Sequence, residues 1–580
     1  MVMKTTNCTN STNFQSYALM ATARFGRKLM LICLFCAFLF GIEVQAQRIA
    51  IISDPDIQDV VGHPELVRTW ESQARSTRLF NENYFAFLAA LDDAAQRGIK
   101  LVILSGDLTD NGQELTCQAV TRILRGFEQQ YGMRFFMTTG NHDPNYPVMS
   151  HWGQKDFLGA DGQPRVIYSD SCQFFLPNKP QEILTPDTVV PSLRCLGYPE
   201  LIQEWHDFGF LPSEGDLYWE HPDNPTSYPD ASYLVEPVPG LWLLSIDGSV
   251  HTHKEAASVG NQTPLLGRGG GRPPLYNGSW PGYNNVMAYK PFLVDWVRSV
   301  VRRSQEQGKR LVVFSHYPLL DFNNGATDIV RKAWGEKAFD LTRVPKPEVA
   351  EAFYEAGVRL HIAGHMHVNQ TGIYRNEGSR RGSLVNVQVP TVAGYMPAYK
   401  ILTIENDSIY DFQTVRIDSV PGYDALFPRY GNLSPLSSRL SPLNNYRQFC
   451  SQWFSELVAN RFVKQDLPKK LQDFLPQMSG TYADASSPSG EATWTGLDLI
   501  TDLYRLRFAG SLALSEIPQA RLQAYEDYFS RCEGDEVHPR SGERGVRSEI
   551  SVLAEVFHCM LNGLPDNHFR VNVRTGELLH

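Results

Sequence analysis

The feature that most constrains this chain is a set of five short blocks that carry metal-binding side chains. Each block directly follows a short apolar run of the kind that forms a buried strand. Carboxylates, carboxamides and imidazoles all bind divalent metals, and glycines within the blocks let the backbone turn sharply. We therefore expect the side chains to leave neighbouring strand ends and to converge on a metal site. The blocks are residues 54–56 (DPD), 106–110 (GDLTD), 140–143 (GNHD), 315–316 (SH) and 364–367 (GHMH).

The periodicity between these blocks predicts an α/β sheet. Apolar runs at 48–53 and 100–105 flank a segment with helical spacing at 85–97, which Gly98 ends. This alternation is typical of sheets whose catalytic loops lie at strand ends. The pattern continues with helices expected at 114–131, 288–304 and 347–355, and strands expected at 133–138, 242–246, 310–315 and 359–363.

The length of 580 residues favours more than one domain, and the composition changes along the chain. Residues 145–285 are rich in Pro, Gly, Trp and Tyr, which indicates a long loop-rich insert that shapes a substrate cleft. Helical spacing returns after a Pro/Ser-rich stretch. We therefore predict a first domain at 47–419 that contains the insert, and a mostly helical C-terminal domain at 440–580 with a polar loop at 476–496.

The N-terminus has the pattern of a secretory signal. Arg24, Arg27 and Lys28 precede an apolar run at 29–42, and small residues lead to Ala46. The apolar run is shorter than the roughly 20 residues that span a bilayer. We therefore expect cleavage after Ala46 rather than a membrane anchor, so that residues 1–46 are a signal peptide. The mature protein is then expected to be periplasmic or secreted, with no transmembrane segment.

Charge and cysteine usage narrow the class of partner. The formal net charge of −10 becomes about −13 without residues 1–46, which disfavours binding to nucleic acid or to anionic membranes. The mature chain has no C-x-x-C pair, which argues against a zinc knuckle or a redox motif. An exported chain permits disulfides, and Cys172 with Cys195 is a candidate pair, whereas Cys117 is expected to be a buried thiol.

The five blocks together resemble the calcineurin-like metallophosphoesterases. That family's pattern runs D-x-H, G-D-x-x-D, G-N-H-[DE], H and G-H-x-H, and the resemblance covers roughly residues 48–400. The segment from Ser105 to Gly112 resembles an exported bacterial branch of the family. The resemblance implies an α/β/β/α sandwich and two divalent metal ions (Mn, Fe, Zn or Mg). It implies a first metal held by Asp54, Asp56, Asp107 and His367, and a second held by Asp107, Asn141, His316 and His365.

The resemblance also implies a mechanism of phosphoester hydrolysis. Metal-bound hydroxide is the expected nucleophile, because metals lower the pKa of bound water. His142 is expected to protonate the leaving oxygen, with Asp143 or Asp110 orienting its ring. The expected substrate is a phosphorylated small molecule or lipid headgroup, and both monoesters and diesters stay open.

One position departs from the family pattern, because Asp56 stands where the family usually has His. A carboxylate can still bind a metal, and its added charge should favour Mn²⁺, Fe or Mg²⁺ over Zn²⁺. The alternative is a site that has lost its first metal, on a phosphoesterase fold that only binds its ligand. A third interpretation, an extracellular nuclease or nucleotide phosphodiesterase, fits the metal chemistry but not the acidic charge.

Other motif-like residues have simpler interpretations. His361 lies within an expected strand and is interpreted as a core histidine. His63, His151, His251 and His253 are candidates to line the cleft, although solvated loop histidines are commoner. The glycine-rich run 267–272 lacks a strand-to-helix context, so it does not predict a phosphate-cradling loop, and contact of Arg268 or Arg272 with phosphate stays a minor alternative. The sequence indicates no oligomeric state.

Overall fold

The protein is described from a computed structural model that covers residues 46–176, 179–210, 230–252, 276–378, 382–433, 445–533 and 547–579. Residues 48–580 form one compact unit. The expected signal peptide and the run 267–272 lie outside the described residues. No helix in the described ranges is both long enough and apolar enough to span a bilayer.

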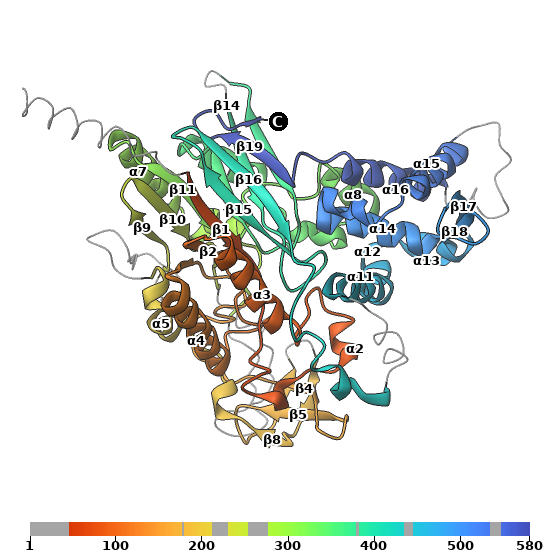
Figure 1. Ribbon diagram of the computed structural model, residues 1–580, viewed down its shortest axis with the longest axis horizontal. Helices are drawn as coiled ribbons and strands as arrows, with labels where there is room; N and C mark the ends of the chain where they lie inside the picture. The colour runs from red at the N-terminus through yellow and green to blue at the C-terminus, as the bar shows by residue number, and fades with distance from the viewer. Residues whose placement is uncertain are drawn as a thin grey trace, which may run out of the picture. The chain divides into compact units, whose positions relative to one another are not determined.

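The first sheet contains the first three strands of the chain side by side (Figure 1). β1 (Gln47–Ile52), β2 (Leu101–Leu104) and β3 (Arg134–Met137) are parallel, with Ile52 beside Leu104 and Leu104 beside Met137. On the other side of β1 the sheet continues through β15 (Ala398–Ile404), β16 (Ile409–Arg416), β19 (His568–Asn572) and β20 (Glu577–Leu579). The carboxyl ends of β1, β2 and β3 therefore meet at one edge.

The second sheet has the same arrangement at its centre. β10 (Leu241–Ile246), β11 (Arg310–Ser315) and β12 (Leu360–Ala363) are parallel neighbours, followed by β14 (Gly382–Gln388). The antiparallel strands β13 (Thr371–Asn376) and β9 (Tyr233–Val238) form its two edges. Apolar side chains of both sheets belong to one continuous core, so the sheets pack face to face.

Helices cover the outer faces of the two sheets, which confirms the α/β/β/α sandwich. α3 (Asn83–Gln96) and α4 (Glu114–Tyr131) lie with the first sheet (Figure 1). α7 (Phe292–Glu306) packs against β11, and α9 (Pro347–Glu355) packs against β13 and β14. α4 ends at Gly132, whose φ of 63° is the left-handed conformation that a glycine adopts at little cost.

The insert contains short strands that pack around small separate cores. The strands are β4 (Gly153–Leu158), β5 (Pro164–Tyr168), β6 (Phe174–Leu176), β7 (Lys179–Leu184) and β8 (Thr188–Val189), and α5 (Tyr198–Glu204) follows them. The candidate disulfide is not formed, because Cys172 and Cys195 are both free thiols. The backbone of Cys195 instead bridges to Ser150 and Gln113, and Cys117 is a buried thiol as expected.

The C-terminal region is mostly helical, as expected. Its helices are α11 (Tyr446–Leu457), the π-helix η6 (Val458–Phe462), α12 (Val463–Asp466), α13 (Lys469–Phe474), α14 (Gly496–Ala509), α15 (Gln519–Glu533) and α16 (Arg547–Leu561). Two features differ from expectation. The polar segment is not a loop but contains the hairpin of β17 (Ser479–Ala483) and β18 (Glu491–Thr495), and the final strands β19 and β20 join the first sheet. The domain boundaries at 47–419 and 440–580 stay predictions.

Direct hydrogen bonds join these helices to the sandwich. The indole Nε1 of Trp453 donates to the carbonyl oxygen of Gln73 at 2.8 Å. Nη2 of Arg507 donates to the carbonyl oxygen of Phe339 at 2.9 Å, and the Arg507 side chain is almost fully buried. Buried bonds of this kind are costly to break, so these contacts hold the C-terminal helices against α2 (Trp70–Gln73) and η4 (Ala338–Arg343).

A buried carboxyl group predicts how stability changes with pH. Glu82 precedes α3 and accepts a hydrogen bond from the Tyr430 hydroxyl, and burial raises the pKa of Glu82 from 4.5 to about 7. The raised pKa means that the neutral form stabilises the fold, so this stability is complete below pH 4.5 and is lost as pH rises through 7. We expect Glu82→Gln to be more stable than the wild type at pH 8 by roughly 3 kcal/mol. Urea unfolding at pH 5 and pH 8 measures this.

The matched control for this prediction is Glu71→Gln, because the Glu71 side chain is 78% exposed on α2 (Trp70–Gln73). That variant should keep the pH dependence of the wild type. An equal loss of stability between pH 5 and pH 8 in wild type and Glu82→Gln would contradict the assignment.

Candidate metal centre

The five predicted blocks all lie at the carboxyl ends of parallel strands. Residues 54–56 follow β1, 106–110 follow β2 and 140–143 follow β3, which are neighbours in the first sheet. His316 directly follows β11, and 364–367 directly follow β12, its neighbour in the second sheet. The sandwich therefore brings seven predicted ligands from five loops to one edge. Those ligands are Asp54, Asp56, Asp107, Asn141, His316, His365 and His367.

Five of these seven residues have a left-handed backbone conformation that non-glycine residues rarely adopt. Their φ angles are 47° for Asp54, 44° for Asp56, 48° for Asp107, 71° for His365 and 58° for His367. Each such residue costs about 1 kcal/mol or more, so the conformation persists only where the surrounding fold enforces it. Strain concentrated on the predicted ligands indicates that the fold holds them for a purpose other than stability.

Two glycines in the blocks make room for ligand side chains. Gly106 has φ 87°, and a Cβ atom there would lie 2.7 Å from Nδ1 of His316. A Cβ atom on Gly140 would collide with the carboxylate of Asp107. The glycines therefore permit the close approach of the loops as well as the sharp turns.

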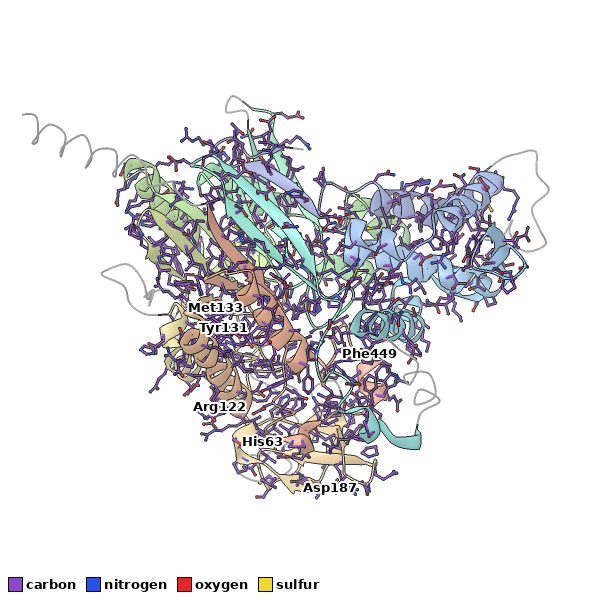
Figure 2. The ribbon with its side chains drawn as sticks, in the orientation of Figure 1. His63, Arg122, Tyr131, Met133, Asp187 and Phe449 are labelled. Atoms are coloured by element: carbon purple, nitrogen blue, oxygen red, sulfur yellow. The ribbon has the colours of Figure 1, made fainter. Side chains whose placement is uncertain are left out.

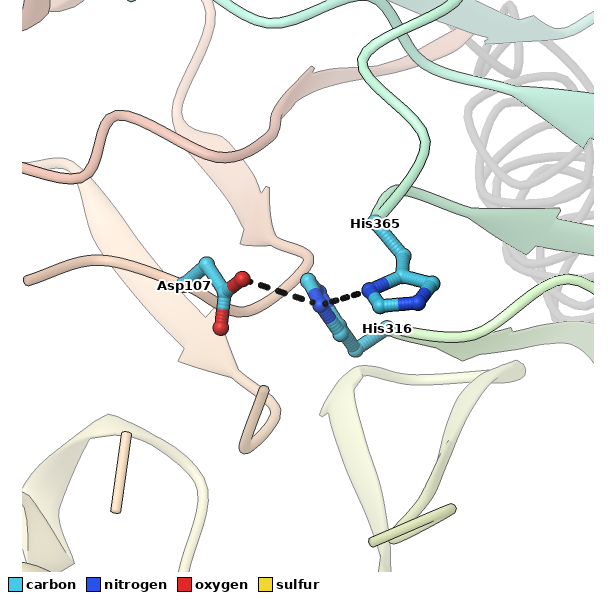
Figure 3. Close-up of side chains that lie close together, drawn as sticks. All are labelled: Asp107, His316 and His365. Atoms are coloured by element: carbon cyan, nitrogen blue, oxygen red, sulfur yellow. Dashed lines mark hydrogen bonds and ion pairs between the residues drawn. The ribbon is translucent and has the colours of Figure 1, made fainter. Parts of the chain in front are cut away.

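Asp107, His316 and His365 form the centre of the cluster (Figure 3). Nε2 of His316 lies 3.2 Å from Oδ2 of Asp107 and 3.1 Å from Nδ1 of His365. The same nitrogen lies 3.2 Å from Oδ1 of Asn141. Nδ1 of His316 donates to the carbonyl oxygen of Ser105 at 2.9 Å, which leaves the lone pair of Nε2 directed at the cluster. These four side chains are the predicted ligands of the second metal.

The predicted ligands of the first metal gather on the other side of Asp107. Nε2 of His367 lies 3.5 Å from Oδ1 of Asp54 and 3.7 Å from Oδ2 of Asp56. Nδ1 of His367 donates to the carbonyl oxygen of Thr77 at 3.4 Å, so the Nε2 lone pair again faces the carboxylates. Asp54 is fixed by the backbone N–H of His365, which donates to its carboxylate at 3.1 Å.

The donor set fits divalent cations. Apart from the ion pair of Arg78 with Oδ1 at 3.1 Å, the carboxylate of Asp56 has no hydrogen-bond partner among the described residues. Nε2 of His365 has no such partner either, although this nitrogen and both Asp56 oxygens are buried. Burial raises the pKa of Asp56, Arg78 opposes this, and the carboxylates of Asp107 and Asp54 raise it further. Buried carboxylates this close together require positive charge between them, which a divalent cation supplies.

His142 is not among the seven predicted ligands, although one of its ring nitrogens lies within 4.8 Å of carboxylate oxygens of Asp56 and Asp107. Its backbone N–H donates to Oδ1 of Asp107 at 2.7 Å, which ties its loop to the central carboxylate. Its ring Nδ1 lies 3.3 Å from Oδ1 of Asn111 and 3.4 Å from Nη2 of Arg78. Burial and Arg78 lower the pKa of His142 to about 4. A negative charge on a bound ligand would raise that pKa.

The two aspartates expected to orient His142 have other contacts in the structure. The Asp143 carboxylate accepts hydrogen bonds from the backbone N–H groups of Leu108 at 2.7 Å and Thr109 at 2.8 Å. It therefore braces the loop that carries Asp107 and does not contact the His142 ring. Asp110 accepts a hydrogen bond from Nη2 of Arg78 at 2.5 Å. The ring of His142 is instead positioned by Asn111 and by the backbone of Asp110.

Comparison with known proteins agrees with this geometry. Residues 47–230 match the family model described as calcineurin-like phosphoesterase. The curated protein Serine/threonine-protein phosphatase CPPED1 of Bos taurus is 33% identical over 97 residues, which are 17% of this chain. The chain spans 28% of the length of that relative.

Solved structures of low similarity include two phosphatases. A dimetal phosphatase from Danio rerio has 13% identity and a TM-score of 0.34, covering 64% of this chain and 96% of that chain. Purple acid phosphatase PPD1 from yellow lupin (Lupinus luteus) seeds has 11% identity and a TM-score of 0.30, covering 64% of this chain and 52% of that chain.

The candidate metal centre also contains an arginine that no sequence motif predicts. Nε of Arg78 lies 3.1 Å from Oδ1 of Asp56, and its Nη2 binds Asp110 and approaches His142. The Arg78 side chain is 15% exposed, and it borders the same pocket as His365 and His367. Arg78 lies in the irregular segment between α2 and α3, where no motif marks it. Arg78 is identified only from the fold, where its guanidinium group lies beside the Asp56 carboxylate.

The other histidines that the sequence pattern offered lie outside this cluster. His361 is buried and contacts Ser315 and Asn386, as expected for a core histidine. His63 pairs with Glu65 beside η1 (Pro64–Leu66), which packs on β4 (Figure 2). His151 contacts Ser169, and His251 is buried beside Asn277. His253, Arg268 and Arg272 lie outside the described residues.

Proposed function

We propose that this protein is a phosphoesterase that hydrolyses a phosphate ester with two divalent cations held at the edge of the sandwich. The single observation that supports this most is the convergence of seven oxygen and nitrogen donors from five strand ends. The donors fall into two sets that share Asp107, and a shared carboxylate is what two closely spaced cations require. Bound cations would supply a nucleophilic water at neutral pH and positive charge for the phosphoryl oxygens.

The protein residues have separate tasks in this proposal. Asp54, Asp56 and His367 hold one cation, Asn141, His316 and His365 hold the other, and Asp107 lies between the two sets. His142 donates a proton to the leaving oxygen, and Arg78 holds the Asp56 and Asp110 carboxylates beside it. His142 must be protonated to act as an acid, whereas its pKa in the free protein is lowered to about 4. The role therefore requires that the negative charge of the bound phosphate raises this pKa.

A substrate panel tests the proposal directly. Hydrolysis of p-nitrophenyl phosphate and of bis-p-nitrophenyl phosphate is measured with Mn²⁺, Fe²⁺, Mg²⁺ or Zn²⁺ added to metal-free protein. We expect metal-dependent turnover of at least one compound, and the ratio of the two rates assigns monoester or diester preference. Metal-loaded protein that hydrolyses neither compound, nor any of a wider set of phosphate esters, would favour the ligand-binding alternative.

The proposal places the enzyme outside the cytoplasm, in the periplasm or the medium. The support is the basic flank, the apolar run at 29–42 and the small residues that precede the expected cleavage after Ala46. N-terminal sequencing of protein recovered from a periplasmic extract should begin at Gln47. Recovery of the uncleaved chain from the membrane fraction would contradict this location.

Asp56 predicts an altered metal preference. A carboxylate in place of the family's imidazole adds negative charge and a harder donor, so Mn²⁺, Fe or Mg²⁺ should be favoured over Zn²⁺. We expect protein expressed in mixed-metal medium to contain two metals per chain with little zinc, and Asp56→His to shift the content towards zinc by several-fold. Elemental analysis of both proteins measures this.

The measured metal content also decides whether Asp56 binds a metal or pairs with Arg78. Arg78 lies 3.1 Å from the carboxylate of Asp56, and this ion pair could compete with a cation. A single metal per wild-type chain would show that Asp56 serves Arg78 and not a metal. Zinc as the dominant metal in the wild type would contradict the predicted preference.

A further inference from the structure

Beside the metal ligands, the C-terminal region contributes to a pocket that contains more positive charge than one phosphoryl group needs. The pocket is bordered on one side by His365, His367 and Asp107, and on the other by Arg343, Arg461 and Phe508. Arg343 ends η4 (Ala338–Arg343), Arg461 lies on the π-helix η6, and Phe508 lies on α14. Two of these residues thus come from the helices that follow the sandwich.

Two hydrogen bonds position the Arg461 side chain and leave other N–H groups of its guanidinium available to a ligand. Its Nε donates to Oε1 of Gln465 at 3.1 Å, and its Nη1 donates to the carbonyl oxygen of Arg75 at 3.4 Å. A guanidinium group has five N–H donors, so these two bonds fix its position and leave others for a ligand. π-helical turns are rare and often lie at functional sites, which is consistent with a side chain positioned for use.

Arg343 has even fewer contacts. Its side chain is partly exposed and makes no hydrogen bond or ion pair with any residue that the structure describes. Arginine is well suited to phosphate and carboxylate groups because its planar N–H fork can contact two oxygens at once. Against the effect of burial, the charge of Arg343 lowers the pKa of Asp340, but the N–H groups of Arg343 donate to no described residue and are therefore available for an anionic ligand.

The local charge balance supports an anionic ligand at this wall. Among the described residues that border the pocket, Asp340 is the only carboxylate outside the metal-ligand set, and it also pairs with Arg507 at 3.3 Å. Burial lowers the pKa of Arg461, Asp340 opposes this, and the nearby positive charges of Arg343 and Arg78 lower it further. An anion between these arginines would relieve their mutual repulsion.

We propose that Arg343 and Arg461 form a subsite for a second anionic group of the substrate, a few bonds away from the phosphoryl group that is hydrolysed. The expected substrate class is a compound with two closely spaced phosphate groups, because two guanidinium groups from different elements, η4 and η6, border the same pocket as the metal ligands and can bind one additional phosphate. This inference rests on the proposed phosphoesterase function and deepens it. It assigns the C-terminal helices a role in substrate selection.

The test compares ligands that differ only in their second group. Methylenebisphosphonate carries two phosphonate groups, phosphonoacetate replaces one of them by a carboxylate, and methylphosphonate lacks it. Binding to the metal-loaded protein is measured by calorimetry, and inhibition of p-nitrophenyl phosphate hydrolysis is measured in parallel. We expect methylenebisphosphonate to bind at least ten-fold more tightly than methylphosphonate. Preference for phosphonoacetate would instead assign the subsite to a carboxylate.

Variants then assign the preference to the two arginines. Arg343→Gln and Arg461→Gln should each reduce the ratio of methylphosphonate to methylenebisphosphonate dissociation constants at least three-fold, and the double variant should abolish the preference. Arg461→Lys should restore part of it, which a purely structural role would not predict. The matched control is Lys464→Gln, which removes a positive charge from the exposed side of α12 and should keep the wild-type ratio.

The outcomes separate this inference from the proposed function. An unchanged ratio in the double variant would overturn the subsite, because the preference would then come from chelation of the metals alone. Equal binding of all three ligands by the wild type would also overturn it. Absence of any turnover would reject the phosphoesterase function, whereas the calorimetric ratio would still report on the subsite.

Discussion

Asp107→Asn is expected to lower kcat/KM for a phosphate ester by about 1,000-fold or more, which corresponds to roughly 4 kcal/mol of transition-state stabilisation. Asp107 contacts His316 on one side and the His142 backbone on the other, and it belongs to both predicted ligand sets. The loss of its charge should therefore weaken both cations at once. Steady-state kinetics and elemental analysis should show the loss of activity together with a loss of bound metal.

The control for this prediction is Asp328→Asn, because the Asp328 side chain is 93% exposed on α8 (Thr327–Trp334). That variant should retain wild-type activity and metal content. Asp107→Asn protein that keeps two metals and more than a tenth of the wild-type rate would show that Asp107 does not lie between the cations.

His142→Ala is expected to separate catalysis from metal binding. The expected loss of kcat is roughly 100- to 10,000-fold with metal content unchanged, because a general acid contributes about that much and His142 is not among the seven ligands. The loss should be larger for an alkyl phosphate than for p-nitrophenyl phosphate, whose leaving oxygen needs little protonation. Rates for both esters in wild type and variant measure the difference.

The pH dependence gives a second readout for the same residue. The protonated form of His142 is the active one, and burial and Arg78 lower its pKa to about 4 in the free protein. The kcat/KM for an alkyl phosphate should therefore include a decline with rising pH as this proton is lost, and His142→Ala should lack that decline. Equal losses for both esters, or an unchanged pH profile in the variant, would reject the acid role.

The strands and the ligand loops were predictable because each ligand follows a strand directly. An apolar run such as 100–105 fixes the strand, and the parallel pairing of β1 with β2 and β3 then brings residues 54 and 107 to the same edge. Sequence order and strand position together are enough for this conclusion. The family pattern was needed for the sandwich arrangement, for the division of the ligands between two cations and for the role of His142.

Features that depend on packing between distant segments were not predictable. Arg78 and Arg461 lie in irregular or helical segments without a motif, and only the folded chain brings them to the pocket. The family resemblance implies that Asp143 or Asp110 orients the His142 ring, yet the Asp143 carboxylate accepts hydrogen bonds from the N–H groups of Leu108 and Thr109. The hairpin of β17 and β18 was missed because its strands are mostly polar, with Trp494 as its one fully buried apolar anchor.

The left-handed backbone at Asp54, Asp56, Asp107, His365 and His367 has a consequence for how the proposed site would take up metal ions. The chain bears this conformational cost when it folds, so the coordination geometry is already set when an ion arrives. An ion of unsuitable radius cannot move these ligands to the distances that it prefers. Selectivity among competing ions should therefore depend on the rigidity of these loops. Substitutions that make the loops more flexible should weaken the selectivity even when they lie far from every ligand atom.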